Sequence, residues 1–185
     1  MQMAFDEVKA TQTAAFLLKM SGGTAKHLAL IKLLYKLDRE ALRRWGIPVT
    51  TDKYVSMKYG PVTSRIYNLI KESAVPSFHP TFWSTHIRRS DNMSMSLALD
   101  PGDSELSPAE EALAREIFGV DGLKDGFTLA EECHRDFPEW KDPGDSSSPI
   151  NISDILAALG KTEDEVAHTE SSISAQKGLL SLQKV

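Results

Sequence analysis

The chain has 185 residues, a net charge of −5, and 41% hydrophobic and 25% charged residues, a composition typical of one globular domain. No uncharged apolar run approaches the roughly 18 residues of a membrane span, because Lys32 and Lys36 interrupt the best candidate. Asp6 and Glu7 lie where a signal peptide needs basic and then apolar residues. The sequence has a single cysteine, Cys133, which cannot form a disulfide within the chain. We therefore expect a cytoplasmic protein.

Charge is unevenly distributed along the chain. Residues 1–100 carry 14 Lys and Arg against 8 Asp and Glu, a net charge of +6, whereas residues 101–185 carry 7 against 18, a net charge of −11. The two parts could attract each other, or they could offer a partner two differently charged surfaces. Nucleic acid is not the favoured partner of an acidic chain, although the basic part leaves that alternative open.

The N-terminal part predicts two helices, over residues 4–20 and 26–45. The sequence SGGT separates them, because two glycines disfavour a continuing helix and Thr24 can cap the next one. The second helix is apolar around much of its circumference, which is typical of a central helix. Its basic residues recur at i, i+4, i+7 and i+11 and form what we name the basic stripe: Lys32, Lys36, Arg39 and Arg43.

The basic stripe has two interpretations. It could be a solvated helix face, partly neutralised by Glu40, which lies four residues after Lys36 and four before Arg44. It could instead be a docking face for an acidic partner or for phosphate, including the phosphates of DNA. The solvated face is the favoured interpretation, because exposed charge pairs contribute little free energy and are common on protein surfaces.

A loop over residues 46–55 precedes the sequence GPV at Gly60 to Val62. Proline suits the first helical position and glycine can precede it as a cap, so we expect a helix that begins at Pro61. Its apolar residues recur at i, i+4, i+7 and i+8, as one buried stripe: Val62, Ile66, Leu69 and Ile70.

A β-hairpin is expected further along the chain. Apolar residues alternate with small ones from Met93 to Leu99, after the turn residues SDN, and the preceding segment FWSTHIRR is the expected paired strand. Trp83, Arg88 and Arg89 on this hairpin are candidates for partner binding, since interfaces favour aromatic residues and arginine. The alternative is that Trp83 only packs beneath the hairpin.

Capping signals begin four further helices: Ser107 with Glu110, Thr128 with Glu131, Asn151, and Thr162 with Glu165. From about His168 the sequence becomes polar and loses periodicity, so we expect a mobile tail. The predicted fold is mainly α (α+β), a compact helical domain with one small antiparallel β-hairpin. Its predicted division is a domain over residues 1–160, followed by a C-terminal helix and tail over residues 161–185.

The sequence offers no recognisable catalytic centre. It contains no GxxxxGK[ST], HExxH, GxSxG or GxGxxG pattern, and its histidines are dispersed. Cys133 and His134 are neighbours on one helix and point about 100° apart, so they cannot face each other as nucleophile and base. We expect no catalysis, metal or cofactor, and a hydrolase that uses His134 with Asp136 or Glu132 is the last alternative.

Several segments together resemble one family. The segment from Leu28 to Lys71 is similar to the Panacea domain, or SocA-like antitoxin and phage-associated domain, whose progression is KLLY…DR…G.P…D…GPV…IY..L. The matching residues are Lys32, Leu33, Leu34, Tyr35, Asp38, Arg39, Gly46, Pro48, Asp52, Gly60, Pro61, Val62, Ile66, Tyr67 and Leu69. The later segments LSPAEE and CHRDFPEW also fit, with Glu139 inserted between Pro138 and Trp140, and the resemblance spans roughly residues 5–160.

The resemblance implies an antitoxin that binds a cognate protein toxin and holds it inactive. Alternatives are an adaptor that presents the toxin to an AAA+ protease such as ClpXP, and an autoregulator that binds DNA. The motif residues expected to build the scaffold are Lys32, Tyr35, Asp38, Arg39, Gly60, Pro61 and Tyr67. The candidates for partner binding are Lys36, Arg43, Trp83, Arg88, Arg89, His134 and Trp140. The oligomeric state and the identity of the toxin stay open.

Overall fold

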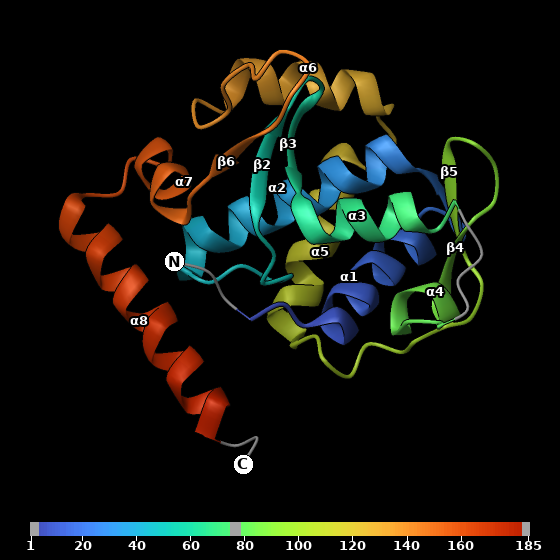
Figure 1. Ribbon diagram of the computed structural model, residues 1–185, viewed down its shortest axis with the longest axis horizontal. Coiled ribbons are helices and arrows are strands. Elements are labelled where there is room, and N and C mark those ends of the chain that lie inside the picture. The colour runs from blue at the N-terminus through green and yellow to red at the C-terminus, as the bar shows by residue number, and fades with distance from the viewer. Residues whose placement is uncertain (1–3, 75–78, 183–185) are drawn as a thin grey trace.

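The computed structural model describes residues 4–74 and 79–182 and shows a mainly α protein, which confirms the predicted fold class (Figure 1). Over these residues the helices are α1 Glu7–Met20, α2 His27–Trp45, α3 Ser64–Glu72, α4 Phe82–His86, α5 Pro108–Asp121, α6 Gly126–Asp136, α7 Ile152–Ala158 and α8 Glu163–Leu182. The strands are β1 Thr24–Lys26, β2 Tyr54–Met57, β3 Gly60–Thr63, β4 Ile87–Arg89, β5 Ser94–Leu97 and β6 Ser148–Ile150. Within the described ranges, no helix has the length and apolar character to cross a bilayer.

The β structure is larger than the single hairpin that the sequence predicts. Two antiparallel three-stranded sheets form within the described ranges, with strand orders β1-β5-β4 and β3-β2-β6. The expected hairpin is β4 and β5, in which Ile87 lies opposite Leu97. Residues 82–86, expected as strand, form α4 instead, because Thr81 and Ser84 make a capping box. Thr24 lies in β1 and does not cap α2.

The helix expected to begin at Pro61 begins three residues later. Gly60 and Pro61 lie in β3, which pairs with β2 around a two-residue turn, Lys58 and Tyr59. Gly60 has φ +96°, which favours glycine, and Pro61 is tolerated because β3 is an edge strand. Asp52 explains the later start, since its carboxylate accepts from the first amides of α3, Arg65 N and Ile66 N, at 3.0 and 2.9 Å.

Helix α2 is central, as its wide apolar surface predicts. It contacts α1, α5, α6 and β3, and ten of its residues are buried. The expected stripe of α3 also faces the core, with Ile66 and Ile70 fully covered. A smaller apolar cluster beneath α7 includes Tyr35 and Tyr54.

The later helices begin where the capping signals in the sequence predicted, except for α6. The capping box of Ser107 and Glu110 opens α5, and Asn151 with Asp154 opens α7. In α6, however, the cap is Asp125, whose carboxylate accepts from Thr128 N at 3.1 Å. Thr128 is therefore already inside the helix.

The C-terminal segment is helical where a mobile tail was expected. Helix α8 continues without a break from Glu163 to Leu182 and extends away from the body (Figure 1), and residues 183–185 of the expected tail lie outside the described residues. The helix is held to the body at Thr169, which lies beside Gly46, and at Ile173 near its middle, which is 2% exposed.

The charge asymmetry is used within the fold. Ion pairs join basic residues of the first hundred positions to acidic residues of the remainder: Lys9 to Glu110, Lys36 to Asp121 and Glu132, Arg39 to Glu139, Arg44 to Glu116, and Lys58 to Asp145. The two oppositely charged parts therefore attract each other, which is the first of the two alternatives that the sequence left open.

Candidate functional site

Each side chain of the basic stripe of α2 has a partner within the protein itself, and for three of the four that partner is a carboxylate. Lys32 has no exposed surface, and its Nζ donates to the Pro61 carbonyl at 2.8 Å. Arg43 is half exposed but pairs with Glu40 of the same helix. A docking face of free positive charge, for phosphate or for an acidic partner, is therefore not formed by these residues.

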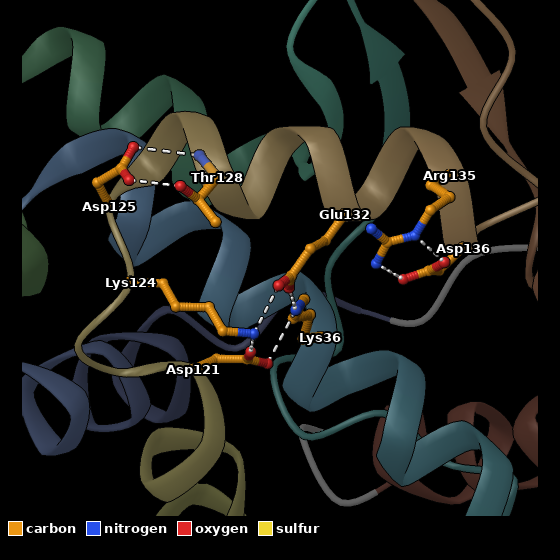
Figure 2. A network of polar contacts seen from close by, with 8 residues as sticks. All are labelled: Lys36, Asp121, Lys124, Asp125, Thr128, Glu132, Arg135 and Asp136. Atoms are coloured by element: carbon orange, nitrogen blue, oxygen red, sulfur yellow. Dashed lines mark hydrogen bonds and ion pairs between the residues drawn. The ribbon is translucent and has the colours of Figure 1, made fainter.

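Lys36 lies in a network of two ammonium groups and two carboxylates that joins α2 to α5 and α6 (Figure 2). Its Nζ lies 2.8 Å from Asp121 and 2.7 Å from Glu132, and Lys124 contacts the same carboxylates at 2.7 and 2.6 Å. Burial acts to raise the pKa of Asp121, but hydrogen bonds from Lys124 and Lys36 outweigh it and hold that pKa below its usual value. The network fastens α6 to α2.

Asp38 fixes the loop after α2. Its Oδ1 accepts from Val49 N and Thr50 N at 2.9 and 2.8 Å, and its Oδ2 accepts from the hydroxyls of Thr50 and Tyr54. Burial raises the pKa of Asp38 to about 6, against the effect of these hydrogen bonds. These four hydrogen bonds hold the loop after α2 and the start of β2 against the helix.

Glu139, the residue inserted into the proline–tryptophan motif, has a structural role. It is 7% exposed, accepts from the Tyr35 hydroxyl at 2.9 Å and pairs with Arg39 at 2.7 Å. Burial, followed by the neighbouring Glu139 carboxylate, raises the pKa of Tyr35 well above its usual value. The cluster ties the segment after α6 to the middle of α2.

The candidate surface around Trp83 is not formed. Trp83 is 1% exposed, and its indole N–H donates to the Ser73 hydroxyl at 3.1 Å, so the packing alternative is the one observed. Arg89 donates to the carbonyls of Asn92 and Ile70, while Arg88 is exposed. Without Trp83 the two arginines lack the aromatic neighbour on which their candidacy rested.

Aromatic side chains that are exposed or partly exposed gather where α6 meets the β2–β3 turn. His134 stacks on Trp140 with ring centroids 3.9 Å apart, and the Trp140 indole donates to the Met57 carbonyl at 2.9 Å. On the other side of the turn, Tyr59 and Phe127 meet edge to face at 5.8 Å. We name this surface the α6 face: Lys58, Tyr59, Phe127, His134 and Trp140.

Tyr59 and Phe127 were missed as candidates in the sequence. They are 51% and 55% exposed. The buried residues of α6 recur at i, i+3, i+4 and i+7, namely Gly126, Leu129, Ala130 and Cys133, so Phe127 lies outside the stripe that packing requires. A large aromatic residue off the apolar stripe was the available signal for Phe127.

Cys133 and His134 point in different directions from α6, as helical geometry predicts: Cys133 faces the core and His134 faces the surface. Cys133 is fully buried, and burial raises the pKa of its thiol to about 11. Asp136, considered as a partner of His134, pairs with Arg135, and Glu132 belongs to the lysine network.

A cavity of about 330 Å³ opens beside the α6 face. Its apolar lining comes from α2, β2, β3 and α3: Leu28, Ile31, Met57, Val62 and Tyr67. Tyr59 and Lys58 also line it, so the cavity is continuous with the α6 face. Lys32 and Gly60 are part of its wall.

Residues 30–141 match the family described as Antitoxin SocA-like, Panacea domain. The chain belongs to this family. The match covers more than half of the sequence and includes the Lys36 network, Asp38, Glu139 and every residue of the α6 face. A search of curated proteins and a search of solved structures found no match to the chain.

Proposed function

We propose that this antitoxin-family chain neutralises a cognate protein toxin by direct binding, with the α6 face as its contact surface, and that it acts without catalysis of its own. One observation carries the proposal: the α6 face exposes aromatic rings, Tyr59 and Phe127, that the core does not need. Aromatic residues are enriched at the centres of protein interfaces, where a few of them supply most of the binding free energy.

The surroundings of the α6 face also suit binding. The Lys36 network and the Glu139 cluster hold α6 and the following segment against α2, so the aromatic rings are presented by fixed elements. Pre-organised contact residues lower the entropy lost on association. A stable interface needs roughly 1,000 Å² or more of buried surface, which one helix face with an adjacent turn and cavity can supply.

The test uses the small open reading frame beside the gene for this chain as the source of the toxin. We expect its induction to arrest growth and co-expression of this chain to restore growth, with the two proteins purifying together. Phe127→Ser should lose both effects, whereas Leu99→Ser, at an equally exposed apolar residue (56% against 55%), should retain them. Rescue of growth without a physical complex would contradict direct binding.

A second candidate function is delivery of the bound toxin to an AAA+ protease such as ClpXP. The outward course of α8 in Figure 1 favours it, since a 20-residue helix that leaves the body could be held by a second protein. Truncation after Ala175 removes the outer part of α8 and leaves Ile173 in place. Delivery predicts that the truncated chain still binds the toxin and that the toxin's half-life lengthens; an unchanged half-life would count against it.

A further inference from the structure

Glu131 is an exposed carboxylate that lies among the aromatic residues of the α6 face. It follows Phe127 by one turn of α6 and precedes His134 by one more, so the three side chains leave the helix on the same side, and all three are exposed. Burial and then Lys32 lower the pKa of His134, whereas the carboxylates of Asp142 and Glu131 act to raise it. The charge of Glu131 therefore acts on the surface that the aromatic rings form.

Glu131 has no cationic partner within ion-pair distance in residues 4–74 and 79–175, although the other two carboxylates of α6 do. Glu132 belongs to the Lys36 network, and Asp136 pairs with Arg135 at 2.7 Å (Figure 2). Helix α6 thus presents one carboxylate whose charge is not compensated by the described part of the chain.

The cations around the α6 face are directed elsewhere. Lys58 pairs with Asp145 at 3.2 Å, and Lys124 belongs to the Lys36 network. Lys141 lines a separate cavity together with Pro149. The described residues therefore supply no cation to Glu131.

Elsewhere in this chain, a phenylalanine ring and a glutamate together hold an arginine. The Arg39 guanidinium lies 4.2 Å from the centroid of the Phe137 ring and pairs with Glu139 at 2.7 Å. Arg115 repeats this arrangement: its guanidinium lies 4.7 Å from the Phe16 centroid and pairs at 3.2 Å with the glutamate four residues before it. One guanidinium makes both contacts because its flat face meets the ring and its N–H groups meet the carboxylate.

The α6 face has the ring and the carboxylate of this arrangement without the arginine. Phe127 and Glu131 are one helical turn apart, and Tyr59 meets Phe127 edge to face with an interplanar angle of 86°. Both rings are about half exposed, and over residues 4–74 and 79–175 no cation lies above either of them. The ring surface and the carboxylate are therefore both open to a partner.

We propose that an arginine of the toxin binds here, with its guanidinium stacked on the rings of Phe127 and Tyr59 and paired with Glu131. The inference rests on the proposed function and names the chemistry of its contact. A cation that docks at this place meets a negative charge that the described chain leaves unpaired, so the two surfaces are complementary. The rings and the toxin exclude water from the pair, which strengthens an attraction that would be weak in open solvent.

The first experiment is a coupling measurement with the purified toxin. Each Arg and Lys of the toxin is replaced by Gln, and the affinity of each variant is measured by calorimetry for the parent chain and for Glu131→Gln. We expect Glu131→Gln to bind the unmodified toxin about tenfold more weakly than the parent does. One arginine variant of the toxin should show a similar loss with the parent and little further loss with Glu131→Gln.

The matched control is Glu105→Gln, which removes the same charge from the segment before α5. Glu105 is also exposed and has no ion pair with residues 4–74 or 79–175. Because the two variants have the same net charge, a general electrostatic attraction would weaken both equally. We expect Glu105→Gln to bind the toxin as the parent does.

The second experiment separates stacking from charge. The arginine identified by the coupling is replaced by Lys, which keeps the charge and removes the planar group. The parent chain should bind this toxin variant several-fold more weakly than the unmodified toxin. With Phe127→Leu, which keeps an apolar side chain and removes the ring, the difference between the two toxins should shrink.

Four results would overturn the inference: undiminished affinity of Glu131→Gln, equal losses with Glu131→Gln and Glu105→Gln, no arginine variant of the toxin that couples to Glu131, or coupling to a lysine instead. If Phe127→Ser loses binding while Glu131→Gln keeps it, the inference fails and the proposed function stands. If both variants bind the toxin as the parent does, the α6 face is not the contact surface and both proposals fail.

Discussion

Helices α2 and α6 lie against each other and use their polar and aromatic residues in opposite ways. The charges of α2 are directed inward or along the helix, and Lys36, Arg39 and Arg43 each meet a carboxylate of this chain. Helix α6 also contributes to that internal network through Glu132, but it leaves Phe127 and His134 outside. The row of charges on α2 belongs to the scaffold, because those charges pair within the chain. The aromatic residues that α6 leaves outside the core form the candidate surface for recognition.

The largest expected effect tests the scaffold role of α2. Asp38→Ala removes the acceptor of four hydrogen bonds and leaves two amides and two hydroxyls unsatisfied. We expect the free energy of unfolding to fall by about 3–5 kcal/mol, measured by urea denaturation. Glu40→Ala, which breaks pairs with partly exposed arginines, is the control and should cost under about 1 kcal/mol. A loss of under about 1 kcal/mol for Asp38→Ala would contradict the scaffold role.

Lys32→Met tests how a buried lysine that bonds a backbone carbonyl, and no carboxylate of the described residues, affects the stability of the fold. The pKa of Lys32 falls from 10.5 to about 8, which corresponds to about 3 kcal/mol of destabilisation at pH 7, while the lost bond to Pro61 costs about 1 kcal/mol. The variant should therefore be at least as stable as the parent at pH 7. Between about pH 8 and 10.5 the unfolded parent binds more protons than the folded parent, so the parent gains stability and the advantage of the variant shrinks. Denaturation at pH 7, 9 and 10.5 measures this difference, and a variant less stable by more than about 2 kcal/mol at pH 7 would oppose the account.

Lys36→Met sharpens the contrast between the two lysines. It leaves the Asp121 and Glu132 carboxylates with Lys124 as their remaining lysine partner in the network. We expect a loss of about 1–2 kcal/mol in the free energy of unfolding, because one cation of a largely buried network is removed. Thermal denaturation near neutral pH checks the value. A gain in stability would show that the network is not what fastens α6.

The smallest expected effect on stability belongs to the α6 face. Tyr59→Ser and Phe127→Ser alter side chains that are about half exposed, so each should change the free energy of unfolding by about 0.5 kcal/mol or less. The same urea denaturation measures this change. A loss above about 2 kcal/mol would mean that the aromatic pair supports the fold, and the contrast between α2 and α6 would disappear.

Local patterns predicted the elements whose determinants are close together in sequence. The wide apolar surface of α2 and the box formed by Ser107 and Glu110 each lie within one helix, so periodicity and spacing were sufficient to place them. The start of α3 could not be placed in this way. The amides of Arg65 and Ile66 at its start donate to Asp52, which lies 13 and 14 residues before them. The glycine–proline signal that suggested a helix start belongs to a strand turn.

The candidate site was only half predictable for the same reason. His134 and Trp140 were candidates from the sequence, and the structure stacks them, while their role in partner binding stays a prediction. Tyr59 and Phe127 are 68 positions apart, and their contact depends on the packing of α6 against the β2–β3 turn. Lys32 and Lys36 are equivalent by helical spacing, and the neighbouring elements alone decide that one is isolated and the other paired.

The central claim is that the α6 face binds the toxin, and the most direct measurement is the affinity of the purified toxin for Phe127→Ser and for Leu99→Ser. The account predicts that the first variant loses affinity by about tenfold or more, as for a central interface aromatic, while the second binds as the parent does. Equal affinities of both variants and the parent would contradict the claim.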